Sequence, residues 1–303
     1  MNIEIIDAKS FKQLFTHTVH IYNTTEFTEL NREKCENVVY FAFYDKKARL
    51  GLIAGERNGT LLSPFSAPFG GFVSTGDADI KHFDNAISLL VAEGKKVNLT
   101  LPPALYHPAL VAKTTNAMIS HGAKAIADLN YHYDLSRFPI YMQQLDSKTR
   151  NKLNNSLKQN FNLEVFNNNN SGIERAYRVI QLNRKAKGYP LRMSLNDVAS
   201  TIKIIKADFF VLSLDNVDIA AAQVFHVADG IVQVIYWGDI PQYSSYRPMN
   251  YLAYKIFQHY HRLGIRIVDV GPSSSDGVPN YGLCEFKESV GCKATLKFTL
   301  SIG

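Results

Sequence analysis

The pattern of hydrophobic residues in the second half of the chain predicts three consecutive strands. Residues 208–214 (DFFVLSL), 219–227 (IAAAQVFHV) and 231–238 (IVQVIYWG) are rich in apolar and β-branched side chains. The turn formers Asp215-Asn216 and Asp229-Gly230 separate the three segments. Because short turns join antiparallel neighbours, this part of the chain is expected to form a meander.

The next predicted element is a helix, after which strands and helices alternate. Apolar side chains recur at helical spacing, at Met249, Leu252, Ile256, Tyr260 and Leu263. Pro248 suits the first turn of this helix, and Gly264 suits its end. Residues 266–271 are predicted to form a short strand, residues 282–290 a short helix and residues 294–302 a closing strand.

The first half shows the same succession of patterns. Strands are predicted over residues 40–45, 50–56, 97–101 and 125–135, with a helix over residues 80–92. Three further segments have helical character: residues 147–159, 173–186 and 195–205. A meander followed by helix, strand, helix and strand indicates a mixed sheet flanked by helices. The predicted fold class is therefore α+β, with mostly antiparallel strands in each half.

Short matches at a nearly constant offset indicate that the two halves are copies of one unit. Residues 122–125 (GAKA) match residues 291–294 (GCKA) at an offset of 169, and each segment precedes a predicted closing strand. Two more matches, each at an offset of 170, are Gly94 with Gly264 and Asp45 with Asp215. Three matches in one register predict a tandem duplication.

The length of the chain agrees with this duplication. At 303 residues it is about twice a typical domain length of ~150 residues. The repeat predicts a first domain over residues 1–134 and a second over residues 171–303, with a connecting helix and loop over residues 135–170. Hydrophobic residues make up 46% of the chain, so each half can bury a core of its own.

Composition also indicates the cellular compartment in which the protein is expected. No segment reaches the ~18 consecutive apolar residues of a membrane helix, and the N-terminus, with Glu4 and Asp7, does not resemble a signal peptide. Three cysteines suit a reducing compartment better than a disulfide framework, and no Cys-x-x-Cys spacing suggests zinc. We therefore expect a cytoplasmic protein with no membrane span and no bound metal.

Positive charge is concentrated in one stretch of the sequence. The formal net charge is +6, whereas residues 146–206 contain 12 Lys and Arg against four Asp and Glu. Such a field can attract phosphate-bearing partners, including nucleotides, tRNA or anionic lipid, and DNA is not expected among them. The alternative is a set of ordinary solvated helix faces. If the charges act together, they are expected to form one positive face.

Six motifs in the second half follow a recognisable order. They are Arg150-Asn151-Lys152-Leu153, Leu182-Asn183-Arg184, Gly188-Tyr189-Pro190-Leu191-Arg192, Tyr246-Arg247-Pro248, Asp269-Val270-Gly271 and Gly282-Leu283-Cys284-Glu285-Phe286-Lys287. With the order of elements, they resemble the double-GNAT proteins of the Fem type, the FemABX-like peptidyltransferases of the GNAT acyltransferase superfamily. The family has an aromatic residue where Val290 precedes Gly291. The first copy resembles the family only in element order and in residues 64–72.

This resemblance implies an N-acyl or aminoacyl transferase that acts on a primary amine, in a groove between two GNAT-like units. Fem enzymes take the aminoacyl group from charged tRNA and place it on a cell-wall peptide precursor, whereas ordinary GNAT enzymes use acyl-CoA. The resemblance therefore implies acyl-CoA or aminoacyl-tRNA as a donor substrate, with no permanently bound cofactor. The implied acceptor carries an amine, as a cell-wall precursor does.

The resemblance assigns three residues to the reaction centre. Amide formation needs a deprotonated amine beside a polarised carbonyl, and no covalent enzyme intermediate is required. Lys287 is expected to point into the groove, where it stabilises charge on the carbonyl oxygen or binds a phosphate, and to add little to stability; an exposed helix lysine is the alternative. Asp269 either orients the amine or caps a turn. Phe286 packs beneath the substrate or in the core.

Other residues are candidates for binding. The predicted substrate contacts are Arg184, Arg192, Tyr236, Trp237, Tyr246 and Arg247, in which the arginines suit anionic groups. GNAT donors lie along a strand that corresponds to residues 236–238, so Gly238 is a cofactor-binding candidate. Residues 242–247 lack the glycines of the usual pyrophosphate cradle. In the first copy Gly70 and Gly71 occupy the corresponding place, where they form either a donor site or a plain turn.

Two interpretations therefore remain open at this stage. The first is a transferase of the Fem and GNAT type, which the Phe286-Lys287 pair favours. The second is a catalytically silent binding module that keeps the fold for a phosphate-bearing ligand or partner, which the missing glycine cradle favours. Because a fold does not fix a function, the site itself has to separate the two.

Overall fold

The computed structural model describes residues 1–92, 94–167 and 170–303, and the chain divides into two discontinuous compact units. Unit 1 comprises Met1–Asn130, Ser274–Pro279 and Thr295–Gly303, and unit 2 comprises Tyr131–Ser273 and Asn280–Ala294. The segment expected as a connection, residues 135–170, thus belongs to unit 2. The chain end belongs to unit 1, because strand β15 (Lys293–Ile302) pairs antiparallel with β6 (Lys96–Thr100).

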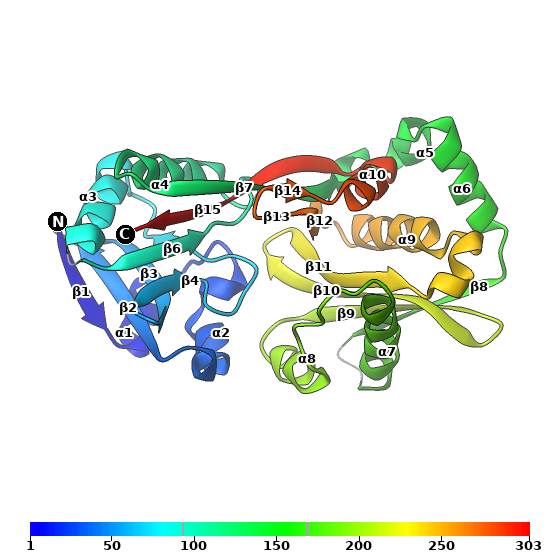
Figure 1. The fold of residues 1–303 in the computed structure, drawn as a ribbon, viewed down its shortest axis with the longest axis horizontal. Helices are drawn as coiled ribbons and strands as arrows, with labels where there is room; N and C mark the ends of the chain where they lie inside the picture. Colours follow the sequence, from blue (N-terminus) through cyan, green and yellow to red (C-terminus); the bar gives the residue numbers. More distant parts are fainter. Residues whose placement is uncertain (93, 168–169) are drawn as a thin grey trace. The chain divides into compact units, whose positions relative to one another are not determined.

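The sheet of unit 1 is built around a meander (Figure 1). Its strands lie in the order β1 (Asn2–Ile6), β2 (Asn37–Tyr44), β3 (Ala48–Arg57), β4 (Thr60–Ser63), β6 and β15. β4 and β6 run parallel, the other neighbours run antiparallel, and β5 (Phe72–Ser74) adds to β3. The order confirms the predicted mixed and mostly antiparallel sheet.

Both faces of this sheet are covered, which explains the continuous apolar run of β2. Alternate residues Val39, Phe41 and Phe43 join a core that also contains residues of α3 (Ile80–Ala92) and α4 (Pro108–Ser120). On the other face, Val38, Tyr40 and Ala42 pack with Phe11 and Phe15 at α1 (Ala8–Leu14). The short helix α2 (Thr25–Leu30) contacts α1. Because successive side chains of β2 point to opposite faces of the sheet, the strand contributes residues to two cores.

Unit 2 repeats the strand order of unit 1. Its strands lie in the order β8 (Phe161–Asn167), β9 (Ala207–Leu214), β10 (Val217–Ala228), β11 (Ile231–Asp239) and β12 (Ile267–Pro272). Within this series β11 and β12 are the parallel pair, as β4 and β6 are in unit 1, and the other neighbours run antiparallel. The series β8 to β12 therefore matches β1, β2, β3, β4 and β6 in order and direction, which confirms that the chain holds two copies of one unit.

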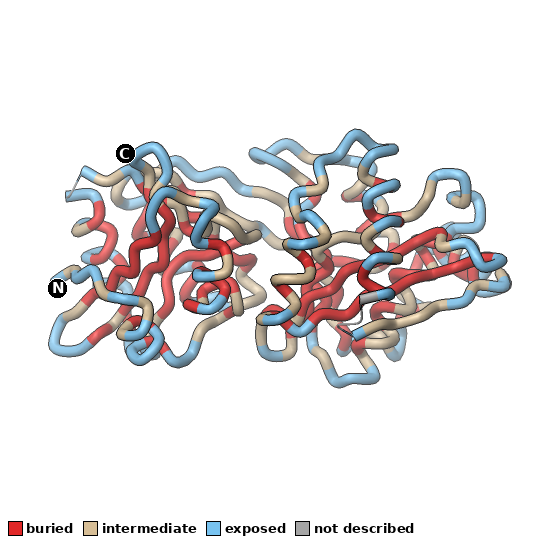
Figure 2. Tube along the Cα trace, turned by 90° about the horizontal axis from the view of Figure 1, so that it is seen from below, coloured by how far each residue is buried: buried red, intermediate tan, exposed pale blue. Residues whose placement is uncertain are grey.

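Helices cover both faces of the unit 2 sheet. α7 (Asn170–Ala186) packs on one face of β9–β11, and α9 (Pro248–Arg262) packs on the other (Figure 1). β9 is consequently buried along its whole length. Buried residues follow the strands within each unit, whereas most turns are exposed (Figure 2). The fully apolar strands of the sequence are thus those that lie between two helical layers.

The basic stretch divides between these two helical layers. α6 (Ser147–Leu157) packs on α9, whereas α7 and α8 (Leu195–Thr201) lie on the other side of the sheet (Figure 1). The expectation of a single positive face was therefore wrong, because α6 lies on one face of the sheet and α7 and α8 lie on the other. Its cations are best described as several separate local groups.

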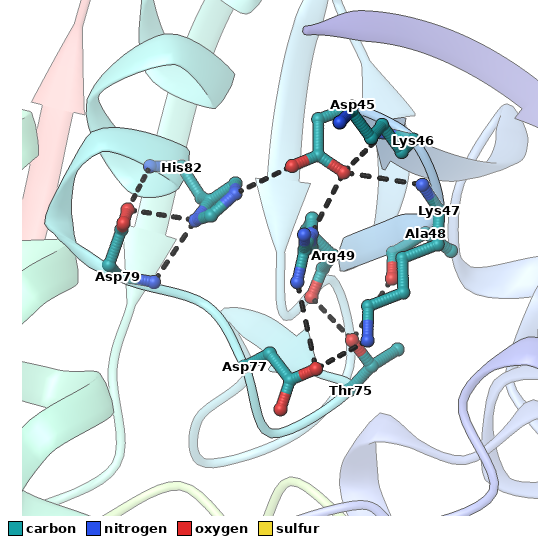
Figure 3. A network of polar contacts seen from close by, with 9 residues as sticks. All are labelled: Asp45, Lys46, Lys47, Ala48, Arg49, Thr75, Asp77, Asp79 and His82. Carbon is teal, nitrogen blue, oxygen red and sulfur yellow. Dashed lines mark hydrogen bonds and ion pairs between the residues drawn. The ribbon is translucent and has the colours of Figure 1, made fainter.

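A polar network ties the β2–β3 turn of unit 1 to the start of α3 (Figure 3). Asp45 accepts a hydrogen bond from Arg49 Nε at 2.8 Å and lies 3.2 Å from His82 Nε2. Asp77 pairs with both Lys47 and Arg49. The hydrogen bond from Arg49 is the main cause that holds the pKa of Asp45 well below its usual range. The acidic and basic side chains of the network pair with one another, so its role is structural.

The remaining elements are short. The 3₁₀ helices are η1 (Ile21–Asn23), η2 (Arg32–Lys34), η3 (Leu135–Ile140) and η4 (Pro241–Tyr246), and α5 (Tyr141–Gln144) follows η3. β13 (Ser274–Ser275) and β14 (Val278–Pro279) form a hairpin before α10 (Tyr281–Ser289). β7 (Lys124–Asp134) begins in unit 1 and ends in unit 2. This crossing matters for the site because it delivers Tyr131 to unit 2.

Candidate functional site

The candidate site lies in unit 2, where two parallel strands stop pairing. β11 and β12 are in register from Ile231 and Ile267 to Gln233 and Asp269, although β11 continues to Asp239. A register shift between β10 and β11 follows, at residues 234–236. The ladder between β11 and β12 is thus interrupted beyond Asp269, at the segment predicted to hold a donor.

Lys287, on α10, is directed at the end of β12. Its ammonium donates hydrogen bonds to the carbonyl oxygens of Gly271 at 2.8 Å and Pro272 at 2.9 Å. The side chain is only 2% exposed, and burial lowers its pKa to about 8. The alternative of an exposed helix lysine is wrong, because the side chain is buried and hydrogen-bonded.

Asp269 has a structural role in the observed geometry. Its carboxylate accepts from Gly271 N at 2.9 Å and from Gln233 Nε2 at 2.9 Å, and the residue is fully buried. Gly271 has φ +74°, a conformation that side chains with a Cβ rarely adopt. Asp269 therefore caps a glycine turn, which is one of its two predicted roles, and this turn presents the Gly271 carbonyl to Lys287.

Phe286 and Trp237 form the apolar wall of the site. Their rings meet edge to face with centroids 5.7 Å apart, and both side chains are only partly buried. Phe286 precedes Lys287 on α10, while Trp237 lies on the part of β11 beyond the ladder with β12. The structure therefore brings these two predicted residues together between β11 and α10, where their rings can exclude water from a bound group.

Arg184 brings a second cation to the same region. Its guanidinium lies over the ring of Tyr236 at 4.9 Å and over the ring of Tyr189 at 5.8 Å. Burial lowers the pKa of Arg184, and Arg192 acts on it in the same direction. No ion pair to Arg184 occurs within the described part of the chain. A half-buried guanidinium held by two rings can accept an anionic partner from outside.

Two contacts connect the Arg184 segment to the strand and to α10. Asn183 Nδ2 donates to the Asp239 carbonyl at 2.6 Å, and the Asn183 side chain occupies the place of a Cβ at Gly238. Tyr189 OH accepts from Asn280 Nδ2 at 2.8 Å, and Asn280 also caps α10 through Leu283 N. Gly238 is thus explained by close packing against α7. Its predicted cofactor role remains only a prediction.

Tyr246 and Arg247, two other predicted binding residues, lie where η4 meets α9. Tyr246 is 41% exposed and its ring lies 6.5 Å from that of Tyr243, with Arg247 exposed beside it. Arg247 is a left-handed residue, with φ +59°, at the N-cap of α9. Within the described ranges no hydrogen bond or cation–π contact joins either residue to Lys287. Arg192 is exposed, and its positive charge lowers the pKa of Arg184.

In unit 1 the corresponding glycines belong to a closed turn. Gly70 N donates to the Thr100 carbonyl at 2.8 Å, and Gly71 N donates to Ser63 Oγ at 3.0 Å. A Cβ at Gly70 would lie 2.8 Å from Ser63 Oγ, and Gly71 has φ +96°. Both residues are buried. The two glycines therefore suit the plain-turn alternative, because their amides are already bonded within the protein.

Sequence reasoning missed several residues of the site, and the reasons differ. Asn183, Tyr189 and Asn280 lie in or beside quoted motifs, but only the fold shows that they meet. Tyr131 lies under the Lys287 ammonium, 5.7 Å from Nζ to the ring centroid. It belongs to the first repeat in the sequence but to unit 2 in the structure.

The comparisons with known proteins concern the fold. No protein-family model and no curated protein matches the sequence. The solved structure of FemX is similar over 99% of this chain and 97% of that chain, with a TM-score of 0.67 and 11% identity. L-PGS from Bacillus licheniformis is similar over 97% of this chain and 90% of that chain, with a TM-score of 0.59 and 12% identity.

A third solved structure carries the same architecture. A tandem GNAT protein from the clavulanic acid biosynthesis pathway is similar over 99% of this chain and 97% of that chain, with a TM-score of 0.58 and 8% identity. Within the described residues, no helix has both the length and the apolar character needed to cross a membrane. The two repeated units and these similarities together show that the chain has the Fem-like double-GNAT fold.

Proposed function

We propose that this chain transfers an acyl or aminoacyl group to a primary amine, at a site in unit 2 centred on Lys287. The observation that carries the proposal is a lysine only 2% exposed, whose ammonium is held by two backbone carbonyls. Burying an ammonium costs several kcal/mol, and no carboxylate forms an ion pair with it among the described residues. A retained cation of this kind is typical of a functional site.

The proposed chemistry is direct attack of the amine on the donor carbonyl. The amine nitrogen forms a bond to the carbonyl carbon, negative charge develops on the carbonyl oxygen, and Lys287 stabilises that charge. The intermediate then expels the thiol or hydroxyl of the donor, which takes up the proton that the amine loses. Trp237 and Phe286 limit access of water, which would otherwise compete with the amine.

Two buried polar side chains in unit 2 support a ligand site there. Ser273 Oγ and Gln223 Nε2 are buried, and neither finds a hydrogen-bond partner in the part of the chain described. Ser273 follows the carbonyl that Lys287 binds, and Gln223 is paired in register with Tyr236. Buried polar groups are normally satisfied, so such donors suit a ligand oxygen. Arg184 adds a binding partner for an anionic part of the substrate.

The geometry also bears on the donor. Residues 241–246 form η4 rather than an open loop of free amides, and the first residue of α9 is Pro248, which has no N–H. A pyrophosphate therefore meets fewer free N–H groups here than at a glycine-rich helix start. These features support aminoacyl-tRNA over acyl-CoA as the donor. The proposed acceptor is an amine-bearing molecule such as a cell-wall precursor.

A catalytically silent binding module is the second candidate. The observation that favours it is η4, which occupies the place where a GNAT enzyme has its glycine-rich donor cradle. If both donor classes fail to bind while a phosphate-bearing ligand binds, this function replaces the first. The two proposals share Arg184 as an anion contact but differ over Lys287. Only the transferase requires Lys287 to act on a reacting carbonyl.

Binding of a donor is expected to stabilise the folded protein. A ligand at 100 times its Kd, bound only by the folded state, raises the free energy of unfolding by about 2.7 kcal/mol. Thermal unfolding with acyl-CoAs, aminoacyl-tRNA and nucleotide-linked sugars measures this effect. We expect an increase in Tm with aminoacyl-tRNA, with acyl-CoA as the weaker ligand.

The matched controls for this measurement lie on one helix. Arg184→Gln should reduce the Tm increase, because it removes the guanidinium between Tyr189 and Tyr236. Arg178→Gln, an exposed position on α7, should leave the increase unchanged. Equal stabilisation of both variants would show that Arg184 does not contact the ligand, and no stabilisation by either donor class would count against a transferase.

A further inference from the structure

We propose that Tyr131 and Glu288 form a positioning pair that holds the Lys287 ammonium in place. The inference rests on the proposed function, because that function gives Lys287 its role at the carbonyl. Tyr131 is nevertheless a positioning residue rather than a catalytic one, since it acts through Lys287. The sequence repeat assigned Tyr131 to the first half of the chain, whereas the structure assigns it to unit 2.

The contacts around Lys287 restrain it from several directions. Two of its N–H groups donate to backbone carbonyls, of Gly271 and Pro272. Nζ also lies 5.7 Å from the ring centroid of Tyr131, a side chain that is 1% exposed. A cation within ~6 Å of an aromatic ring face is attracted by the π electrons. Tyr131 therefore favours the charged form of Lys287 in a place where burial disfavours it.

Glu288 fixes the ring that performs this task. Tyr131 OH donates to Glu288 Oε1 at 2.6 Å, a short charge-assisted hydrogen bond. Burial raises the pKa of Tyr131, and the bond to Glu288 raises it further, so the phenol stays protonated as the donor. A phenol that donates to a carboxylate gains electron density in its ring. The hydrogen bond therefore both orients Tyr131 and strengthens its attraction for the ammonium.

The sequence positions of Glu288 and Lys287 also support the proposed pair. Glu288 follows Lys287 on α10, so one helix carries both the cation and the anchor of the ring that faces it. The charges and titratable groups that act on Lys287 are Cys292, Asp269, Cys284 and Arg184. Asp269 is already bonded to Gly271 N and Gln233. Tyr131 is thus the aromatic partner of the ammonium within the described ranges.

The test measures the titration of Lys287 itself and needs no transfer activity. Nitrogen-15 NMR of the lysine ammonium groups, assigned with Lys287→Met, gives the pKa of Lys287 in each variant. We expect Tyr131→Leu to lower this pKa by about half to one pH unit, the size of a partly buried cation–π contact. Tyr131→Phe keeps the ring but loses the bond to Glu288, so it should cause a smaller decrease.

Tyr133 provides the matched control on the same strand. It is 1% exposed like Tyr131, but its ring stacks on Phe257 and its hydroxyl has no partner among the described residues. Tyr133→Leu should lower Tm while leaving the pKa of Lys287 unchanged. A Tyr131→Leu variant that shifts Lys287 no more than Tyr133→Leu does would overturn the proposal. If the leucine variants do not fold, the same comparison between Tyr131→Phe and Tyr133→Phe decides it.

Activity supplies a second, separate readout. Once a transfer reaction is measured, Tyr131→Phe and Glu288→Gln should lower kcat several-fold with little change in KM, because they disturb the cation at the reacting carbonyl rather than binding. A change in KM alone would contradict positioning. Loss of transfer in Lys287→Met is the test of the proposed function, whereas the titration of Lys287 tests the pair, so the two can fail independently.

Discussion

Replacing Lys287 with methionine is expected to lower the rate of transfer by ~10²-fold or more. This is the scale for losing one preorganised group that stabilises charge on a reacting carbonyl oxygen. Methionine keeps most of the length of the side chain, so the pocket beside Tyr131 and Gly271 stays filled. Steady-state kinetics of the wild type and the variant, with the donor that stabilises the fold, measure the effect.

Stability must be followed in the same experiment. Lys287→Met leaves the carbonyls of Gly271 and Pro272 without their donor, which costs about 1–3 kcal/mol for an unsatisfied buried group, but it also removes a buried charge. Lys293→Met, at an exposed position at the start of β15, is the matched control and should retain full activity. A folded Lys287→Met protein with undiminished transfer would remove Lys287 from the mechanism.

Replacing Asp208 with alanine is expected to lower the free energy of unfolding by about 3–5 kcal/mol, because it breaks a buried charge network. Asp208 is 1% exposed and accepts hydrogen bonds from His226 Nε2 and Tyr260 OH at 2.7 Å each and from Asn167 Nδ2 at 2.8 Å. The network joins β8, β9, β10 and α9. Urea unfolding at neutral pH measures the loss.

The pH dependence of this effect has a definite sign. Burial alone would raise the pKa of Asp208, but the hydrogen bonds from His226 and Tyr260 outweigh it and hold the pKa below its ordinary value of 3.8. A lowered carboxyl pKa contributes stability above the ordinary value, and this contribution is lost as the pH falls through the folded pKa. The difference between wild type and Asp208→Ala should therefore shrink below pH 3.8.

Asp218 is a suitable control for Asp208. Its carboxylate pairs with Arg175 at 2.7 Å, but its side chain is 25% exposed. Asp218→Ala should therefore cost about 1 kcal/mol or less, as partly exposed ion pairs do. Equal losses for the two variants would show that the Asp208 network does not carry the stability assigned to it.

Much of the fold follows from periodicity alone. The predicted helix over residues 80–92 is α3, and the three segments from residue 208 to residue 238 are β9, β10 and β11. These elements are long, strongly patterned and bounded by turn residues. The edge strands β1 and β8 were missed, and their burial patterns explain why: most of their residues are exposed or only half-buried, so the apolar signal is weak.

The division into units could not be predicted from a sequence repeat. A repeat assigns each residue to the copy in which it occurs, but the pairing of β15 with β6 returns the chain end to unit 1. Long-range pairing of this kind leaves no local signal. The same limit concealed Tyr131, which is in the first repeat by sequence and in unit 2 by contact.

The site was predicted in part. Motifs identified Lys287, Phe286 and Arg184. Phe286 contacts Trp237, Arg184 contacts Tyr236, and the charge of Arg184 acts on Lys287. Burial was the main error, since a lysine in a helix motif gives no sign that its charge is enclosed. Gly238 illustrates another limit. The sequence does not distinguish a glycine needed for packing, as Gly238 is against Asn183, from a glycine needed to approach a ligand.

The measurement that tests the central claim most directly is mass spectrometry of an amine acceptor incubated with the protein and a donor. Aminoacyl-tRNA and acyl-CoA serve as donors in separate reactions, and Lys287→Met serves as the negative control. We predict that the acceptor gains the mass of one acyl or aminoacyl group through a new amide, while the mass of the protein stays unchanged, because attack is direct. Absence of amide product with both donors, although a donor binds, would contradict the transferase and establish a binding module.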